Sequence, residues 1–261
     1  MDYIIVCLVA VVVSALTFFS GFGLGTMLMP AFALFFPVPV AVASTAVVHL
    51  ANNLFKAWLV GRQANWGVVG RFAAPATIMA MIGAGLLIFV DNLPAITRYS
   101  LGQHSYEVTA VKLVIGLIII LFALFDLLPQ LASLSFDPRY LPWGGALSGF
   151  FGGLSGNQGA LRSAFLIKLG LPKEVFIATG VMTAVIIDIA RLLVYGVSFY
   201  SAQFSLLTSG SAGLVLAATL AAFVGATVGK RLLPKITLRT VQIIVGLMLM
   251  AVGMGLAAGW L

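Results

Sequence analysis

The sequence predicts an all-α polytopic membrane protein made of two inverted repeats, each with a glycine-broken re-entrant helical hairpin plus three transmembrane helices. Three observations predict this fold class. The chain is 62% hydrophobic and 8% charged, whereas soluble domains are roughly 25% charged. Its apolar runs have the length of about 20 residues that a helix needs to cross a bilayer. Two of these runs also contain a glycine cluster, one in each half of the chain.

Eight apolar segments account for most of the chain. Their lengths favour helices, and no segment is predicted to form a strand. The first segment lacks a basic start and is too long for a signal peptide, so it is predicted to be the first membrane element. In chain order the eight segments are residues 3–36, 40–60, 67–90, 108–127, 143–169, 174–197, 206–229 and 239–260.

The two halves of the chain resemble each other weakly. The loop 128–142 divides a first transmembrane repeat, residues 1–127, from a second one, residues 143–261. When the glycine cluster at 21–25 is placed over the one at 152–156, with four extra residues in the second copy, the helices that follow also align. The alignment places Pro37 on Pro172, Asn53 on Asp188 and Lys56 on Arg191.

The distribution of lysine and arginine predicts how the segments cross the membrane, because cytoplasmic loops collect these residues. If each segment crossed once, the basic residues near 62–71 would lie opposite those near 230–239. If the two glycine-broken segments enter and return as hairpins, nearly all basic loops share one side. Each half then crosses an odd number of times, so the halves are inverted and both termini are periplasmic. The residues placed on the cytoplasmic side are Arg62, Arg71, Arg139, Lys168, Lys173, Lys230, Arg231, Lys235 and Arg239.

The glycine clusters also predict a binding site. Unpaired peptide groups are costly in hydrocarbon, and paired helix breaks in two halves of a chain mark the binding sites of transporters. Helices that restart near Thr26 and near residues 157–160 would present free N–H groups and a positive dipole end, which suits an anion. The alternative is that the glycines only let helices pack closely. The candidate binding residues of the two breaks are Gly23, Gly25, Thr26, Ser155, Asn157, Gln158 and Gly159.

A polar stripe follows one face of the helix predicted at 40–60. Thr45, His49, Asn52 or Asn53, and Lys56 are spaced by three or four residues, and polar faces of membrane helices turn toward the bundle interior. His49 and Asn53 are therefore candidate binding residues. His49 could bind an anion or carry a proton, or it could be a neutral histidine bonded to a carbonyl. For Lys56, a side chain that reaches the lipid headgroups is favoured over a place in the site.

Charged residues also lie within predicted segments of the second half. Asp188 is the only acid well inside a predicted span. It could relay protons, or it could form an internal ion pair with Arg191, three residues further on. Arg162 follows the second break and is the predicted cation of the site, because a guanidinium can bind two oxygens of an oxyanion; the alternative is an arginine that faces the cytoplasm. His49 and Asp188 are the candidates for proton coupling.

Other classes of function have less support. Residues 153–156 match the surroundings of the nucleophile in rhomboid-type intramembrane proteases, but such a serine needs a general base, and no histidine follows Ser155. No cluster resembles a metal site, a phosphate-binding loop or a dinucleotide fingerprint. We therefore predict no catalytic residue, no cofactor and no metal. The net charge of +7 is attributed to cytoplasmic loops rather than to nucleic-acid binding.

These motifs resemble those of the sulfite exporter TauE/SafE family of bacterial membrane transporters, over nearly the whole chain. The resemblance depends on GFGLG at 21–25 with Pro30, on HLANNLFK at 49–56, on GR at 61–62, and on GFFGGLSGNQG at 149–159. It implies a duplicated helical fold. It also implies export of small sulfur-containing anions, such as sulfite or sulfoacetate, from cells that degrade sulfonates.

We therefore expect a secondary transporter of the bacterial inner membrane that exports such an anion. The anion would be held at two broken-helix N-termini near mid-bilayer, with alternating access. A passive anion channel is the main alternative and an intramembrane serine protease a remote one. The expected partners are a small oxyanion and membrane lipid, not nucleic acid, and a homodimer stays open. Uniport and proton-coupled export both stay open, because an inside-negative potential already favours anion export.

Overall fold

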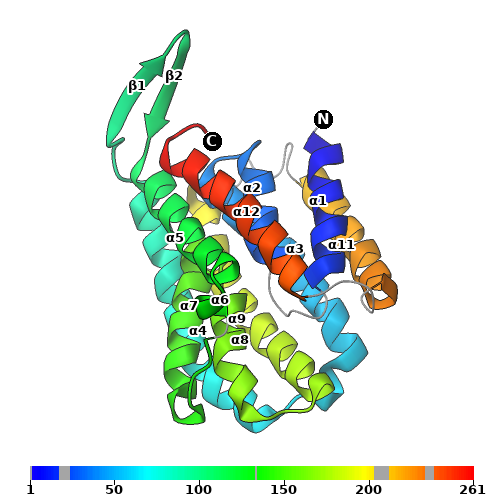
Figure 1. Ribbon diagram of the computed structural model, residues 1–261. Helices are drawn as coiled ribbons and strands as arrows, with labels where there is room; N and C mark the ends of the chain where they lie inside the picture. Colours follow the sequence, from blue (N-terminus) through cyan, green and yellow to red (C-terminus); the bar gives the residue numbers. More distant parts are fainter. Residues whose placement is uncertain (1, 18–23, 133, 203–211, 233–237) are drawn as a thin grey trace.

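The computed structural model describes residues 2–17, 24–132, 134–202, 212–232 and 238–261. These residues are mainly helical, and most of the long helices run between the two ends of the molecule (Figure 1). Four of the described helices are long and apolar enough to cross a membrane: Val38–Gln63, Trp66–Asp91, Ala110–Leu127 and Lys173–Val197. The prediction of an all-α polytopic membrane protein is confirmed.

Each of the eight apolar segments is mainly helical where the structure describes it. The first and fifth segments each contain two helices, and the other six each contain one. The long helices are α1 (Asp2–Thr17), α2 (Leu24–Ala33), α3 (Val38–Val60), α4 (Trp66–Asp91), α5 (Ala110–Leu127), α7 (Leu141–Ser155), α8 (Gly159–Leu166), α9 (Lys173–Ala202), α11 (Ala212–Leu232) and α12 (Leu238–Ala257). Short helical turns lie between them at α6 (Pro129–Ala132), η1 (Gly61–Gln63), η2 (Pro138–Tyr140) and η3 (Ile167–Leu169).

Local sequence determines where several helices begin. The side chain of Asn65 accepts a hydrogen bond from the Val68 N–H (3.1 Å) at the start of α4. The side chain of Thr109 accepts one from the Lys112 N–H (3.3 Å) at the start of α5. These caps satisfy N–H groups that have no partner within the first turn of a helix. α3 carries Pro39 in its first turn, where the missing proline N–H costs no helical hydrogen bond.

The fifth apolar segment forms a hairpin of α7 and α8. The two helices are separated by residues 156–158, where Gly156 adopts a φ of +83°, a conformation that glycine takes without steric cost. The end of α8 lies against the chain that leads into α7: the ring of Phe165 stacks on that of Phe136, with centroids 4.2 Å apart. The segment therefore folds back on itself at its glycine break.

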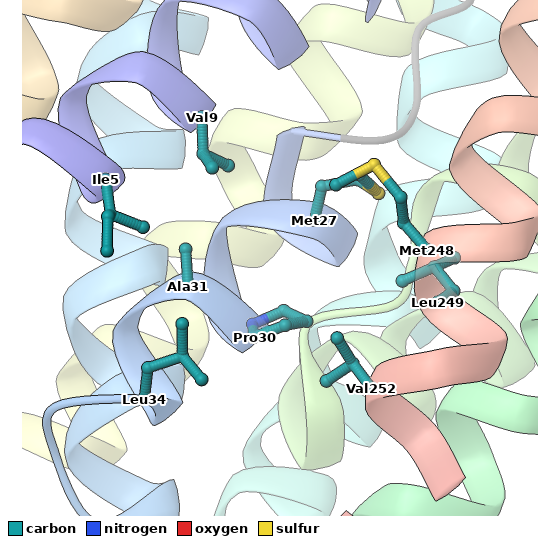
Figure 2. Close-up of a pocket in the computed structure, with 9 residues that line it drawn as sticks. All are labelled: Ile5, Val9, Met27, Pro30, Ala31, Leu34, Met248, Leu249 and Val252. Atoms are coloured by element: carbon teal, nitrogen blue, oxygen red, sulfur yellow. The ribbon is translucent and has the colours of Figure 1, made fainter. Parts of the chain in front are cut away.

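The first apolar segment also contains two helices that pack against each other, α1 and α2. Most of its glycine cluster falls on residues 18–23, which lie outside the described residues. Ile5, near the start of α1, and Leu34, just after α2, line the same apolar pocket of about 230 Å³, which α12 closes on its far side (Figure 2). α2 therefore returns toward the end of the molecule where α1 begins.

Glycines earlier in α7 serve helix packing. Gly145, Gly149 and Gly153 recur every four residues and so share one face of the helix. A Cβ atom added at any of them would lie 2.0 to 2.1 Å from a carbonyl oxygen of α4, so the two backbones are in contact as small residues permit in membranes. The prediction that the whole run 152–156 interrupts the helix is wrong for Gly152 and Gly153, which lie within α7.

A two-stranded antiparallel hairpin projects from one end of the molecule, formed by β1 (Thr97–Leu101) and β2 (His104–Val108) (Figure 1). The hairpin lies between the third and fourth apolar segments, where no element was predicted. The segment between α4 and α5 contains β-branched and aromatic residues, which favour strands. Gly102, with a φ of +64°, permits the two-residue turn that joins them.

Both termini lie at the same end as this β-hairpin (Figure 1). The segments that precede α4, α7 and α9 lie at the opposite end. The first of them contacts α9 itself, since the Asn65 N–H donates to Thr179 Oγ1 (3.0 Å). These segments carry Arg62, Arg139 and Lys168, three of the residues predicted to face the cytoplasm. The inverted relation of the two halves stays a prediction.

Candidate functional site

Asp188 lies at the centre of a buried polar cluster. It belongs to α9 and is fully buried, as is Arg191 one turn further along the helix. Asp188 Oδ1 accepts hydrogen bonds from Arg191 Nη2 (2.7 Å) and Nε (3.1 Å), and from Gln158 Nε2 (2.8 Å). The structure therefore contains the internal ion pair that the sequence offered as one of two interpretations of Asp188.

The second carboxylate oxygen of Asp188 binds residues of α3. His49 Nδ1 lies 2.6 Å from Asp188 Oδ2, and Asn53 Nδ2 donates to the same oxygen at 3.3 Å. Because a carboxylate only accepts, His49 Nδ1 carries the proton in this contact. His49 and Asn53 on α3 thus form one network with Asp188 on α9, and α3 packs directly against α9.

Arg191 also connects this network to the break between α7 and α8. Its Nη1 donates to the carbonyl of Gly152 (3.0 Å), and the hydroxyl of Tyr195, one turn further along α9, donates to the carbonyl of Gly153. The last carbonyls of a helix have no partner within it, and cations are favourable at that end. Arg191 and Tyr195 therefore stabilise the end of α7 and, with it, the position of the break.

The second break lies against the start of α2. A Cβ atom added to Gly25 would lie 3.2 Å from the Gly156 carbonyl oxygen and 3.5 Å from the imidazole of His49. Gly25 is buried and lies in the first turn of α2. The described part of the first glycine cluster and the second break are therefore neighbours, although 131 residues separate Gly25 from Gly156.

The first turn of α8 places an arginine beside free main-chain donors. The N–H groups that open α8, from Gly159 onward, have no partner within the helix. Arg162 lies one turn into α8, is 3% exposed, and donates from Nη1 to Gln158 Oε1 (3.4 Å). A Cβ atom at Gly180 would lie 3.6 Å from Arg162 Nε, so the guanidinium lies against α9. This arrangement can bind an anion between a helix N-terminus and a guanidinium.

Ser155 and Asn157 bind each other at the turn. Ser155 Oγ donates to the Phe151 carbonyl (3.0 Å) and accepts from Asn157 Nδ2 (3.0 Å). Neither partner is a base, so the contacts of Ser155 are not those of an activated nucleophile. Asn157 Oδ1 is buried without a hydrogen-bond partner, which is costly in an apolar medium unless a ligand or water occupies the position.

Lys56 belongs to the buried part of α3, with 6% of its surface exposed. The prediction that its side chain reaches the lipid headgroups is therefore wrong. The sequence stripe from His49 to Lys56 therefore faces the interior along its whole length.

The structure brings most of the predicted residues together. Gly23 lies outside the described residues, and Thr26 belongs to α2 but its side chain is not described. The predicted residues that the described network joins or borders are Gly25, His49, Asn53, Ser155, Asn157, Gln158, Gly159, Arg162 and Asp188. Their roles in binding and in proton coupling stay predictions.

Sequence reasoning did not assign Tyr195 or Ser148 to the site. Ser148 Oγ donates to the Gln158 carbonyl (2.7 Å) and so fixes the turn from the side of α7. The one available signal was periodicity: Tyr195 is a polar residue on the face of α9 that contains Asp188, and Ser148 is one on the face of α7 that contains Gly152. Within the described residues no group of three or more histidine, cysteine, aspartate or glutamate side chains is placed to hold a metal ion.

Comparison with known proteins gives one match. The family model described as sulfite exporter TauE/SafE matches residues 6–256, which include every helix of the cluster described above. No curated protein matches the chain, and no solved structure matches it.

Proposed function

The chain belongs to the sulfite exporter TauE/SafE family, and from this premise we propose that it exports sulfite or an organosulfonate such as sulfoacetate across the bacterial inner membrane. Members of this family are transporters, so the protein is a multi-pass membrane transporter and not an enzyme. The single observation that supports an anionic substrate is a buried guanidinium beside a helix N-terminus. Arg162, one turn into α8, is 3% exposed and lies beside the N–H groups that open this helix.

The substrate binds, in this proposal, where α8 begins. Its oxygens accept from the first N–H groups of α8 and from Arg162, in a region from which lipid and bulk water are excluded. Such donors are fixed before the anion arrives, and charge-assisted hydrogen bonds in a low-dielectric site are strong. Asp188 is not a ligand here, since its oxygens already accept from Arg191, Gln158, His49 and Asn53. It holds the side chains around the anion in place.

Transport then follows from the position of the two breaks. Gly25 and Gly156 face each other at the junction between a hairpin of each half, and small residues at that junction allow one half to move against the other. We propose alternating access at this junction, with the basic loops in the cytoplasm and both termini in the periplasm. An inside-negative potential favours the outward movement of an anion by about 2.3 kcal/mol per charge per 100 mV.

Flux measurements with purified protein in liposomes test this proposal. Vesicles loaded with sulfite or sulfoacetate should release it at a rate that saturates with substrate and shows counterflow, whereas a passive channel gives neither. Arg162→Ala should weaken binding roughly 10- to 100-fold, because charge-assisted hydrogen bonds contribute about 1.5–3 kcal/mol.

Arg62→Ala is the matched control, since Arg62 is exposed in η1 and its loss should leave binding unchanged. Equal binding by the Arg162→Ala variant and the parent protein would remove Arg162 from the site. Absence of any sulfur-anion flux by a folded, reconstituted protein would refute the proposed function.

A further inference from the structure

We propose that the site at the start of α8 is built for an anion that also carries a hydrogen-bond donor, such as hydrogensulfite or a hydroxyalkanesulfonate, and that Asn157 binds this donor. This inference rests on the proposed function and narrows its class of substrate. It starts from the side-chain oxygen of Asn157, which is buried in the turn between α7 and α8 without a hydrogen-bond partner.

The amide of Asn157 is held by its nitrogen. Asn157 is 2% exposed, and its Nδ2 donates to Ser155 Oγ (3.0 Å). The hydroxyl of Ser155 has a single hydrogen, which it donates to the Phe151 carbonyl (3.0 Å), so only lone pairs of Ser155 Oγ remain for Asn157. The amide nitrogen therefore faces Ser155, and the amide oxygen is the atom left free.

This free oxygen does not cap α8. An asparagine before a helix often accepts a hydrogen bond from an N–H group of the first turn, but Asn157 Oδ1 makes no such bond. The side chain of Gln158, which directly precedes α8, caps none of these groups either and donates instead to Asp188 Oδ1 (2.8 Å). The turn thus presents main-chain donors without a side-chain cap and one acceptor without a donor.

The acceptor and the donors are close enough to bind one small molecule. Consecutive Cα atoms are 3.8 Å apart, so the Cα atoms of Asn157 and Gly159 are separated by at most about 7.6 Å. A small sulfonate can bridge this distance. Its oxygens accept from the N–H groups that open α8, while a hydroxyl or acidic hydrogen of the same molecule donates to Asn157 Oδ1.

Burial makes the requirement for a donor strict. A buried acceptor without a partner is costly, and an anion that carries a donor removes this cost, whereas an anion without a donor retains it. Sites that hydrogen-bond a substrate hydroxyl reject the analogue that lacks it more strongly than apolar pockets reject a change in size. Hydrogensulfite carries a donor and fully ionised sulfoacetate carries none, so hydrogensulfite is the better substrate of the two.

An asparagine that only holds the turn predicts something different. Its Nδ2 alone serves that role through Ser155, and a water molecule that stays in place when the anion binds can satisfy Oδ1. The affinity of the site then does not depend on a donor in the anion.

Sulfonates that differ in one group test the inference. 2-Hydroxyethanesulfonate and propane-1-sulfonate have the same charge and nearly the same size, and differ by a hydroxyl in place of a methyl group. 3-Hydroxypropanesulfonate and butane-1-sulfonate form a longer pair. Binding is measured by titration calorimetry on the purified protein in lipid nanodiscs. In at least one pair the hydroxyl compound should bind at least about tenfold more tightly.

Asn157→Leu keeps most of the side-chain volume and removes the acceptor. This variant should lose at least about tenfold in affinity for the hydroxyl compound and less than about threefold for the methyl compound, so the preference disappears. Asn92→Leu is the matched control, because Asn92 is exposed at the end of α4 and its loss should leave the preference unchanged.

Two results would overturn the inference. One is the absence of a preference in both pairs for the parent protein, and the other is an equal loss for both members of a pair in Asn157→Leu. The comparison on the parent protein decides the matter if Asn157→Leu does not fold.

The outcome also separates this inference from the proposed function. Binding of sulfonates or sulfite without a preference for a donor overturns the role of Asn157 and leaves the transporter intact. A folded protein that binds none of these anions and shows no flux overturns both.

Discussion

Replacing Asp188 with alanine is expected to destabilise the folded protein strongly, because it removes the partner of a fully buried arginine. Asp188 and Arg191 are both 0% exposed, and their closest contact is 2.7 Å. Removing one member of a buried ion pair costs about 3–5 kcal/mol, since the other charge is left uncompensated. The neutral hydrogen bonds from Gln158 and Asn53 add less, because such bonds in membrane proteins average about 0.6 kcal/mol. We therefore expect a loss of about 3–5 kcal/mol.

A double-mutant cycle isolates the contribution of the pair. Asp188→Ala and Arg191→Met are made singly and together, and the free energy of unfolding is measured in mixed micelles by titration with a denaturing detergent. The double variant should be more stable than the sum of the single losses predicts, by about 3 kcal/mol. Asp137→Asn is the control, because Asp137 pairs with Arg139 at the surface and its loss should stay within about 0.5 kcal/mol.

Two results would refute this reasoning. One is a loss of less than about 1 kcal/mol in Asp188→Ala, which would mean that Arg191 finds water or another partner. The other is additivity of the single losses within about 0.5 kcal/mol, which is the behaviour of independent sites.

Two glycine substitutions test the packing and the break. Gly149→Ala should destabilise the α4–α7 interface by about 1–3 kcal/mol, because the new Cβ would lie 2.1 Å from the Ala76 carbonyl oxygen, whereas Gly85→Ala, with nothing within 4 Å, should be neutral or stabilising in the same unfolding titration. Gly156→Ala and Gly170→Ala both force alanine into a left-handed conformation, with φ of +83° and +63°, at a cost of about 1–2 kcal/mol each. Only Gly156→Ala should also weaken anion binding, because Gly156 lies at the break and Gly170 in the loop before α9; equal effects on binding would count against a site at the break.

Much of the fold was determined by the sequence alone, because the membrane imposes simple requirements on it. Apolar runs of sufficient length favour helices in lipid, and the eight segments are mainly helical where the structure describes them. The β-hairpin between α4 and α5 was missed because the requirements of the membrane do not apply to it. It lies outside the apolar segments, where strand propensity is weak and depends on context.

The glycines show where pattern reasoning reaches its limit. The sequence does not distinguish a glycine that breaks a helix from a glycine that lets two helices pack closely, and residues 149–156 contain both kinds. Gly153 contacts α4 and Gly156 turns the chain. The sequence could indicate that a break lies in this run, but its position depends on which helix packs against which face.

Sequence alone determined that this is a membrane protein, that a break follows α7, and that polar residues on α3, α8 and α9 face inward. Only the tertiary structure decided which of these residues meet. It brought His49 into contact with Asp188, although the two lie 139 positions apart in the sequence. It also paired Arg191 with Asp188 and with the carbonyl of Gly152. Lys56 is buried, whereas its position near the end of a helix had favoured a side chain that reaches the headgroups. Periodicity defines the face of one helix, whereas a binding site depends on the contacts between helices, and those contacts exist only after the helices have packed.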